Sequence, residues 1–291
     1  MTDKIHIALA ADENYLPGLE VTQRSMMRSC AHPERLVFHV FRETPELAER
    51  IRREFGEYKG SVMAFVRLYL PELLPDADWV VYSDVDTIWN RDVCELWNLA
   101  TASPAPMLYW VRDMWSSRRE AAVWQTRINP EFDTDRYCCS GVAVLNLKKM
   151  RETDFLQRAI DFTRQHRLFR LFDQDILNAL CNRDCGLLPV CWDVLGCWEA
   201  LPDDSRCVYH VTGIGRHFHA TSAPVYPPQY QLWWNVYKGE RGVHPRSRLL
   251  AALWPLHRLV YVLPRPLRER IVRQMYFARE LVRTARGGGV V

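Results

Sequence analysis

Short apolar runs of strand length alternate with segments of helical periodicity along most of this chain, and this alternation restricts its fold more than any other feature. The pattern predicts strands at 5–10, 36–41, 79–83, 104–110 and 141–147. Helices are predicted at 17–30, 45–55, 64–74, 155–166 and 174–180. Such alternation is typical of strands joined by crossover helices, where ligands bind beyond the carboxyl ends of the strands. The sequence therefore predicts an α/β fold.

Length and composition limit the domain count and the class of protein. With 291 residues, of which 48% are hydrophobic, the chain fits one large domain or one domain with a small appendage. The amino end lacks the plan of a signal peptide, so we expect cytoplasmic residence. No glycine-rich dinucleotide or P-loop fingerprint occurs, which argues against a dehydrogenase or a P-loop enzyme.

The nine cysteines form no C-x-x-C pair, and the odd number argues against a disulfide framework. We expect reduced thiols that act as small buried hydrophobic residues. A zinc site is the alternative for one group of cysteines in the second half of the chain: Cys181, Cys185, Cys191, Cys197 and Cys207.

An acidic pair, Asp84-Val85-Asp86, follows the apolar run Trp79–Ser83 directly. Residues two apart on a strand point the same way, so both carboxylates can reach one hard cation. A divalent ion held there could clamp a diphosphate and neutralise its growing charge. The alternative is two solvated acids at a strand end.

The loop after the first strand, from Ala10 to Tyr15, lies where a doubly wound sheet would hold a nucleotide base. An aromatic ring can stack on a base, and short carboxylate and amide groups can pair with base and ribose edges. An ordinary turn that caps the next helix is the other interpretation.

Two later segments supply further polar groups. Asp173-Gln174-Asp175 has the features of a helix start, with Asp173 placed to cap and Gln174 placed to orient a neutral or partially positive group. His210 follows another short apolar run and could complete a two-carboxylate metal site, although a lone histidine is more often a core or surface residue.

A long polar excursion at 112–137, with helix expected around 117–125, separates two predicted strands. Long insertions of this kind often carry binding specificity. Asp113, Trp115 and Arg118 are candidate ligand contacts on this excursion.

Taken in order, these motifs resemble glycosyltransferase family 8, which includes glycogenin and bacterial lipopolysaccharide galactosyl- and glucosyltransferases. The resemblance covers roughly residues 5 to 220 and rests on six separated motifs: Ala10-x-Asp12-x-Asn14-Tyr15, Arg67, Asp84-x-Asp86, Ser140-Gly141-Val142 with Leu145-Asn146-Leu147, Asp173 to Asn178, and His210-x-x-Gly213. It implies a GT-A (Rossmann-like) mixed sheet flanked by helices. It also implies a UDP-sugar donor, Mn²⁺ or Mg²⁺, and transfer with retention of anomeric configuration.

The resemblance also assigns roles to residues. Asp84, Asp86 and His210 would hold the metal, and Asp173 and Gln174 would act on the donor sugar and the anomeric carbon. The remaining donor-binding positions would be Ala10, Asp12, Asn14, Tyr15, Arg67, Val85, Cys139, Ser140, Gly141, Gly213 and Arg216.

Two positions depart from the family pattern. Cys139 stands where the family usually has an asparagine, and Arg216 stands where it usually has a lysine, so donor choice is open. The resemblance implies an enzyme that moves a hexose from a UDP-sugar to a glycan or glycolipid acceptor, such as a lipopolysaccharide core. A noncatalytic sugar-nucleotide-binding protein and a glycogenin-like self-glycosylating protein are the alternatives.

The carboxyl end is strongly basic. Residues 246–286 hold ten arginines against Glu269 and Glu280, although the whole chain carries only +3. The pattern predicts a catalytic domain at 1–242 and a basic amphipathic helical region at 243–291. We expect this region to bind an anionic membrane surface, which would make the protein peripheral on the inner membrane face. A helical cap with arginines in water is the alternative, and nucleic acid is not expected because no reading module accompanies the charge.

Overall fold

The computed structural model describes residues 4–57, 61–102, 106–113, 116–166, 172–195 and 206–210. Several predictions lie outside the described residues: those for Trp115, Cys197, Gly213, Arg216, the side chain of Arg118 and the whole of 243–291.

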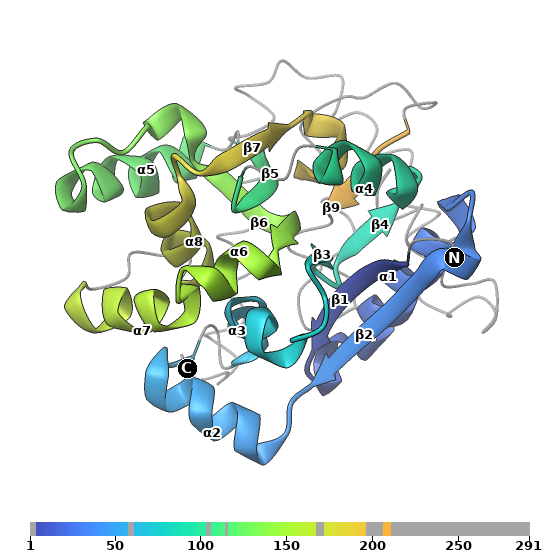
Figure 1. Ribbon diagram of the computed structural model, residues 1–291, viewed down its shortest axis with the longest axis horizontal. Coiled ribbons are helices and arrows are strands. Elements are labelled where there is room, and N and C mark those ends of the chain that lie inside the picture. Colours follow the sequence, from blue (N-terminus) through green and yellow to red (C-terminus); the bar gives the residue numbers. More distant parts are fainter. Residues whose placement is uncertain are drawn as a thin grey trace, which may run out of the picture.

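A central sheet has the strand order β2-β1-β3-β6-β5-β7 (Figure 1). Its strands are β1 Ile5–Ala11, β2 Leu36–Arg42, β3 Trp79–Ser83, β5 Leu108–Arg112, β6 Cys138–Asn146 and β7 Cys185–Leu188. Five of the strands run in the same direction, and β6 runs antiparallel to both of its neighbours. The mixed sheet that the resemblance implies is confirmed.

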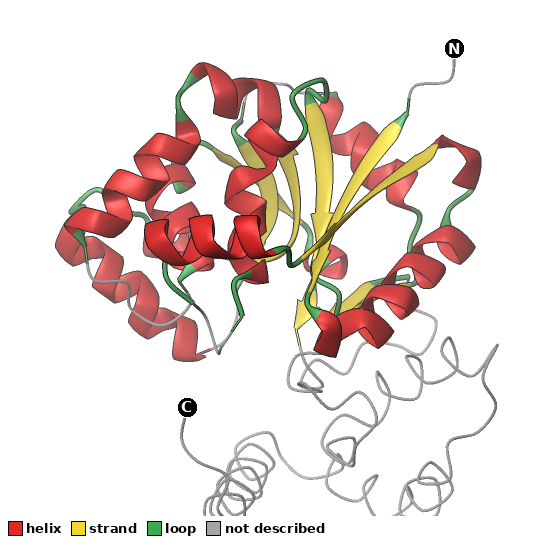
Figure 2. Cartoon of the chain, turned by 90° about the horizontal axis from the view of Figure 1, so that it is seen from below, coloured by secondary structure: helices red, strands yellow, loops and turns green. Residues whose placement is uncertain are grey.

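Alternating side chains along each strand build a separate core on each face of the sheet, because successive residues point to opposite sides. In β1, Ile7 and Leu9 join one core while Ala8 and Ala10 join the other. Helices α1 and α4 cover the first face, and α2, α3, α6, α7 and α8 cover the second. Figure 2 shows the strands enclosed by helices on both sides.

The helices begin where capping groups favour a start. Thr44 Oγ1 accepts a 3.3 Å bond from the Leu47 amide at the start of α2, and the carboxylate of Asp92 accepts a 2.9 Å bond from the Cys94 amide at the start of α4. The bounds are α1 Leu16–Ser29, α2 Pro45–Glu54, α3 Val66–Leu73, α4 Val93–Thr101, α5 Ser116–Ile128, α6 Leu147–Glu152, α7 Phe155–Gln165 and α8 Asp173–Cys181.

A smaller sheet has the order β4-β9-β8. It consists of β4 Thr87–Trp89, β8 Val194–Leu195 and β9 Val208–His210. Thr87 pairs with His210 across the antiparallel β4–β9 ladder. This pairing carries His210 to the residue that follows Asp86.

Most predicted elements are found within one or two residues of their expected bounds. The strand expected at 104–110 runs from 108 to 112, and the strand expected at 141–147 begins three residues earlier, at 138. The sequence did not predict the strands β4, β7, β8 and β9 or the helices α4 and α6. No helix within the described residues is long and apolar enough to cross a membrane.

Candidate active site

The candidate site lies where the end of β3 meets the start of β6. Because β6 is antiparallel to β3, its first residues lie beside the carboxyl end of that strand. The Asp84 amide donates a 2.7 Å hydrogen bond to the Gly141 carbonyl and closes the ladder there. The acidic pair and the Cys139-Ser140-Gly141 segment are thereby neighbours, although more than fifty residues separate them in the chain.

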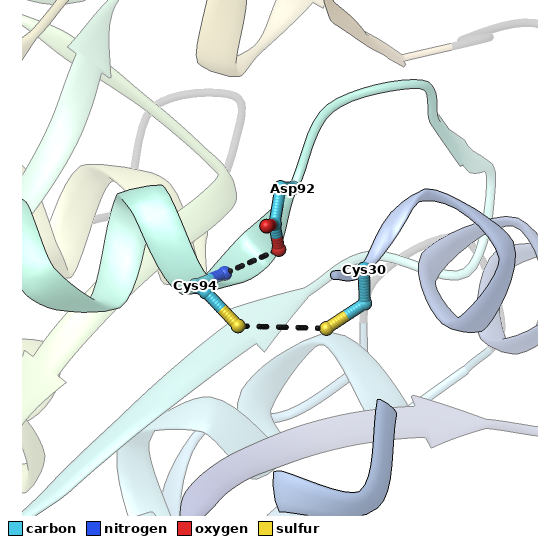
Figure 3. A group of neighbouring side chains, drawn as sticks. All are labelled: Cys30, Asp92 and Cys94. Atoms are coloured by element: carbon cyan, nitrogen blue, oxygen red, sulfur yellow. Dashed lines mark hydrogen bonds between the residues drawn. The ribbon is translucent and has the colours of Figure 1, made fainter. Parts of the chain in front are cut away.

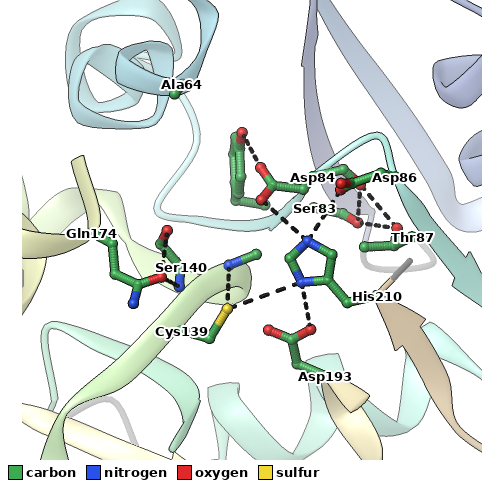
Figure 4. Close-up of polar contacts among 12 residues, drawn as sticks. Ala64, Ser83, Asp84, Asp86, Thr87, Cys139, Ser140, Gln174, Asp193 and His210 are labelled. Carbon is green, nitrogen blue, oxygen red and sulfur yellow. Dashed lines mark hydrogen bonds and ion pairs between the residues drawn. The ribbon is translucent and has the colours of Figure 1, made fainter. Parts of the chain in front are cut away.

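Asp84, Asp86 and His210 converge at this edge (Figure 4). His210 Nε2 lies 3.1 Å from an Asp86 oxygen and 3.7 Å from an Asp84 oxygen. One ligand atom from each of the three residues lies within 4.8 Å of the others. The imidazole is buried, whereas both carboxylates are partly exposed and accessible to a ligand.

A third aspartate, Asp193, holds the other nitrogen of the same imidazole. Its Oδ1 lies 3.0 Å from His210 Nδ1, and the two groups face each other in Figure 4. An acceptor at this position favours the tautomer that carries its proton on Nδ1 and leaves the Nε2 lone pair free. Asp193 follows the short helical turn Val190–Trp192, and the sequence analysis missed it. The sequence signal that could have indicated Asp193 is its position as a single acid in the apolar run around Trp192.

Gly141 makes room for this imidazole. A Cβ at position 141 would lie 2.2 Å from His210 Cε1 and 2.4 Å from His210 Nδ1, far inside van der Waals contact. The backbone at Gly141 does not have a positive φ. The glycine is therefore required by the close approach of His210, whereas the resemblance implied only a donor-binding role.

Arg67 is buried and joins the acids of the site. Its Nη2 lies 2.6 Å from Asp84 Oδ1, and its Nε lies 3.2 Å from Asp173 Oδ2. Its Nη1 donates to the Ser140 carbonyl, and the guanidinium lies 4.2 Å from the centre of the Tyr82 ring. Only 4% of the Arg67 side chain is exposed. Arg67 thus supplies an internal positive charge to two carboxylates.

Asp173 and Gln174, both buried, bind the start of β6. Ser140 Oγ donates a 3.2 Å bond to Asp173, and the Ser140 amide donates a 3.1 Å bond to Gln174 Oε1. Gln174 Nε2 donates to Asp113 at 3.2 Å, so Asp113, which directly follows β5, contacts the site. The prediction that Asp173 caps its helix is wrong. The N-cap is Phe172, without a side-chain cap bond, because the Asp173 carboxylate is engaged by Arg67 and Ser140.

Burial and charge shift the pKa values of these groups in different directions. Burial raises the pKa of Asp173 to about 6, although Arg67 opposes the rise. Burial also raises the pKa of Asp84 against the pull of Arg67. At Asp86 burial acts in the same direction, but the charge and hydrogen bond of His210, a backbone hydrogen bond and the charge of Arg67 together outweigh it, and the pKa falls. At His210, Asp86 and Asp193 outweigh burial, so the pKa of the imidazole rises.

The loop after β1 lies beside this edge, because Leu9 pairs with Ser83 across the sheet. Asp12 caps the short helical turn that follows it, accepting a 2.9 Å bond from the Asn14 amide. Asn14 is exposed and Tyr15 is partly buried. The side chains of Ala10 and Val85 are buried in the two cores, so each could meet a donor only through its backbone.

Cys139 is buried, with its sulfur 4.0 Å from His210 Nδ1. It therefore lies on the Asp193 side of the imidazole and away from the acidic pair (Figure 4). The alternative zinc site has no support within the described part of the chain, where no potential metal-ligand group includes Cys181, Cys185, Cys191 or Cys207.

The donor set fits a hard or borderline divalent cation. Two carboxylates and one oriented imidazole offer oxygen and nitrogen ligands of the kind that Mn²⁺ and Mg²⁺ bind. The second oxygen of Asp193 is buried without a hydrogen-bond partner among the described residues, so the positive charge of a cation at Nε2 would compensate a carboxylate that is otherwise under-paired.

Solved structures of glycosyltransferases share this fold. A galactosyltransferase, LgtC, solved with donor and acceptor sugar analogues, aligns with a TM-score of 0.64 and 20% identity, over 84% of this chain and 99% of its own. The glycosyltransferase GlyE of Streptococcus pneumoniae TIGR4 aligns with a TM-score of 0.60 and 19% identity, over 87% of this chain and 64% of its own. The mixed sheet and its flanking helices are therefore a GT-A fold.

Sequence relatives agree with this fold. An Arabidopsis thaliana protein named "Probable galacturonosyltransferase-like 6" is 26% identical over 207 residues, which cover 57% of this chain and 58% of the relative. The chain spans between about a third and three fifths of the length of the first curated relatives that it matches. A family model, "Glycosyl transferase family 8", matches residues 53–212, more than half of the chain. The chain therefore belongs to glycosyltransferase family 8.

Proposed function

We propose that this protein is a metal-dependent, retaining transferase that moves a hexose from a UDP-sugar to a glycan acceptor. The observation that carries the proposal is the convergence of Asp84, Asp86 and His210 at the edge of the sheet. Family membership supports sugar transfer, and the oxygen and nitrogen ligands support Mn²⁺ or Mg²⁺. When bound, the ion would neutralise the charge that develops on the leaving diphosphate.

In this proposal the surrounding residues bind and orient the donor. The loop at Asp12, Asn14 and Tyr15 binds uridine. Asp173 accepts hydrogen bonds from sugar hydroxyls, a role that suits an ionised carboxylate held by Arg67. Gly213 and Arg216, which lie outside the described residues, close over the diphosphate.

Gln174 is held on two sides, by the Ser140 amide at its oxygen and by Asp113 at its nitrogen. A side chain fixed in this way can keep its amide oxygen beside the anomeric carbon as positive charge develops there. Gln174 cannot titrate, so the leaving phosphate would take the proton of the acceptor hydroxyl, which attacks from the same face. A covalent route through a carboxylate is the rival mechanism.

The first experiment screens a panel of UDP-sugars by thermal shift in Mn²⁺ and then measures UDP release with the sugar that stabilises most. We expect slow, metal-dependent UDP release from the wild type and a loss of at least about 100-fold in Asp86→Ala. Asp135→Asn serves as the control, because Asp135 is an exposed acid outside the candidate metal group. Normal metal-dependent turnover by Asp86→Ala would refute the proposed site.

The second experiment determines the anomeric configuration of the transfer product by NMR. Retention supports the proposed mechanism, and inversion would contradict it.

The presence of Cys139 in place of the family's asparagine favours one competing function, a noncatalytic sugar-nucleotide-binding protein. Tight UDP-sugar binding without turnover, with or without Mn²⁺, would support that function instead.

A further inference from the structure

Two buried thiols and a carboxylate meet away from the candidate active site. Cys30 directly follows α1, and Cys94 lies in the first turn of α4. Their sulfur atoms are 3.5 Å apart, and Asp92 lies beside them, as Figure 3 shows. Cys30 is 8% exposed and Cys94 is 5% exposed, while Asp92 is partly exposed. The group is thus closed on the sulfur side and accessible on the carboxylate side.

The separation of these atoms matches a thiolate metal site. Zn–S bonds of about 2.3 Å at a tetrahedral angle place two sulfur atoms about 3.8 Å apart. The observed 3.5 Å requires a shift of only a few tenths of an ångström. One ligand atom from each of Cys30, Asp92 and Cys94 lies within 4.8 Å of the others. The three ligands therefore need little rearrangement to surround one ion.

We propose that Cys30, Cys94 and Asp92 form a second metal site, which binds Zn²⁺ or a similar borderline-soft divalent cation. Two sulfur ligands and one oxygen ligand favour such a cation, whereas the oxygen and nitrogen ligands of the active site favour Mn²⁺ or Mg²⁺. The fourth tetrahedral position would be open to water on the exposed side of Asp92.

Proton release accompanies binding at this site. Burial raises the pKa of the Cys30 thiol to about 12 and also raises the pKa of the Cys94 thiol, so both are protonated in the metal-free protein at neutral pH. The ion must displace both protons, and its affinity should therefore rise with pH. Arg35 lies close enough to oppose the rise at Cys94, and its positive charge would partly balance two thiolates and a carboxylate.

The proposed site lies beside a row of hydrogen bonds in which hydroxyl groups of α1 contact residues 87–91, here called the β4 segment because it contains β4. Thr22 Oγ1 donates to the Thr87 carbonyl at 2.8 Å, the Trp89 amide donates to Ser25 Oγ at 3.0 Å, and Ser29 Oγ donates to the Arg91 carbonyl at 3.0 Å. A metal bound by Cys30 and Cys94 would add two metal–thiolate bonds next to these hydrogen bonds. We infer a structural role, in which the ion links the end of α1 to the start of α4.

The test uses full-length protein, reduced with a phosphine and stripped of metal. Titration with Co²⁺ should produce an ultraviolet thiolate-to-metal charge-transfer band that saturates at one ion per chain. Cys30→Ser and Cys94→Ser should each lose the band. Cys181→Ser and Cys185→Ser are matched controls at buried thiols elsewhere, in no potential metal-ligand group among the described residues, and should retain it. Loss of the band in either control, with retention in Cys30→Ser, would overturn the proposal, as would the absence of a band in the wild type.

Asp92→Asn keeps the variant folded, because asparagine also caps helix starts and can accept from the Cys94 amide. We expect it to bind Zn²⁺ about 10- to 100-fold more weakly while the metal-free protein unfolds at an unchanged temperature. Zn²⁺ added to wild-type protein in excess Mg²⁺ should raise the unfolding temperature and protect Cys30 and Cys94 from alkylation. Unprotected thiols in Zn²⁺-treated protein would contradict the site.

Discussion

At the scale of single residues, the imidazole of His210 is fixed from both sides. Asp193 engages Nδ1 at 3.0 Å, and Asp86 lies 3.1 Å from Nε2. Such an arrangement fixes the orientation of the imidazole before any ion arrives, because a carboxylate flanks each ring nitrogen. Under the proposed function Asp193 is a positioning residue, because it acts through His210 and contacts the ring nitrogen opposite the one that faces Asp86.

Asp193→Asn should weaken the response to Mn²⁺. The amide keeps the size of the side chain but removes the charge that orients His210, so we expect the Mn²⁺ concentration for half-maximal UDP release to rise about 10- to 100-fold. The maximal rate at saturating Mn²⁺ should change less than the half-maximal concentration. The measurement is UDP release over a Mn²⁺ series, and an unchanged half-maximal concentration would count against the positioning role.

Gly141→Ala should displace His210. The new Cβ would lie 2.2 Å from the imidazole, and overpacking of this kind destabilises proteins by about 1–3 kcal/mol. We expect lower stability together with loss of metal-dependent UDP release. Gly186→Ala is a matched control, because its Cβ would meet the Tyr109 ring at 2.2 Å, away from the acids. Gly186→Ala should lose stability but keep its Mn²⁺-dependent UDP release. Equal loss of Mn²⁺-dependent UDP release in both variants would show that displacement of His210 is not the cause.

Asp173 gives a pH dependence of unusual sign. Burial raises its pKa from 3.8 to about 6, so the folded protein binds a proton that the unfolded chain releases in this range. The free energy of unfolding of the wild type should therefore fall, relative to that of Asp173→Asn, as pH rises from about 4 to about 6. Urea unfolding of both proteins across this range provides the measurement. A difference that stays constant with pH would show that the pKa of Asp173 is not raised.

The sequence could predict this site only in part. Asp84, Asp86 and His210 were expected together because the family motifs imply it, and the structure brings them together. The predicted cap at Asp173 was wrong, because a buried arginine competes for the same carboxylate. Asp193 could not be assigned, since its role depends on β9 pairing with both β4 and β8, and spacing along the chain does not reveal that pairing.

At the scale of elements, helix α1 packs on β4 through hydroxyl groups. Its Thr22, Ser25 and Ser29 recur at three- and four-residue steps, so they share one face of the helix. Each bonds the backbone of the β4 segment. Because β4 follows Asp86 and pairs with His210, these hydrogen bonds support two of the three candidate metal ligands.

Ser25→Ala should destabilise the fold. The Trp89 amide is buried and donates to Ser25 Oγ, so the substitution leaves it without its acceptor at a cost of about 1–3 kcal/mol. Ser29→Ala is the comparison variant, because Ser29 is only partly buried and water can replace its bond. Urea denaturation should show a larger loss for Ser25→Ala, and the reverse order would contradict this account.

Elements were predictable where their periodicity was long and were missed where they were short. Strands β1, β2, β3, β5 and β6 and helices α1, α2, α7 and α8 follow clear patterns, whereas the short strands β7, β8 and β9 were missed. Helix α6 has six residues and begins immediately after β6, so its first residue, Leu147, was assigned to the strand. Helix α4 had a usable signal, since Asp92 and Glu95 have the spacing of a capping box. Strand β4 has only three residues, and its contacts are with β9 and α1, which lie far from it in the sequence.

At the scale of the whole molecule, charge is segregated along the chain. Residues 246–286 carry about +8 against +3 for the whole chain, so the remainder carries about −5. This basic region lies outside the described residues. Its attachment to a membrane surface is a prediction of the sequence that the structure leaves untested.

Removal of residues from 246 onward should reduce binding to anionic lipid. Each arginine near such a surface contributes about 1 kcal/mol, so we expect cosedimentation with phosphatidylserine vesicles to be lost in the truncated protein. High salt should weaken binding of the full chain. Undiminished sedimentation of the truncated protein would count against a lipid-binding role, and binding to neutral vesicles alone would exclude an electrostatic one.

The buried guanidinium of Arg67 has a consequence for the metal-free protein. Its permanent positive charge lies within ion-pair distance of Asp84 and Asp173, so these two carboxylates need not repel each other when no ion is bound. Under the proposed function, the site should therefore keep its shape without the ion, and rebinding of the ion should require diffusion alone, without refolding.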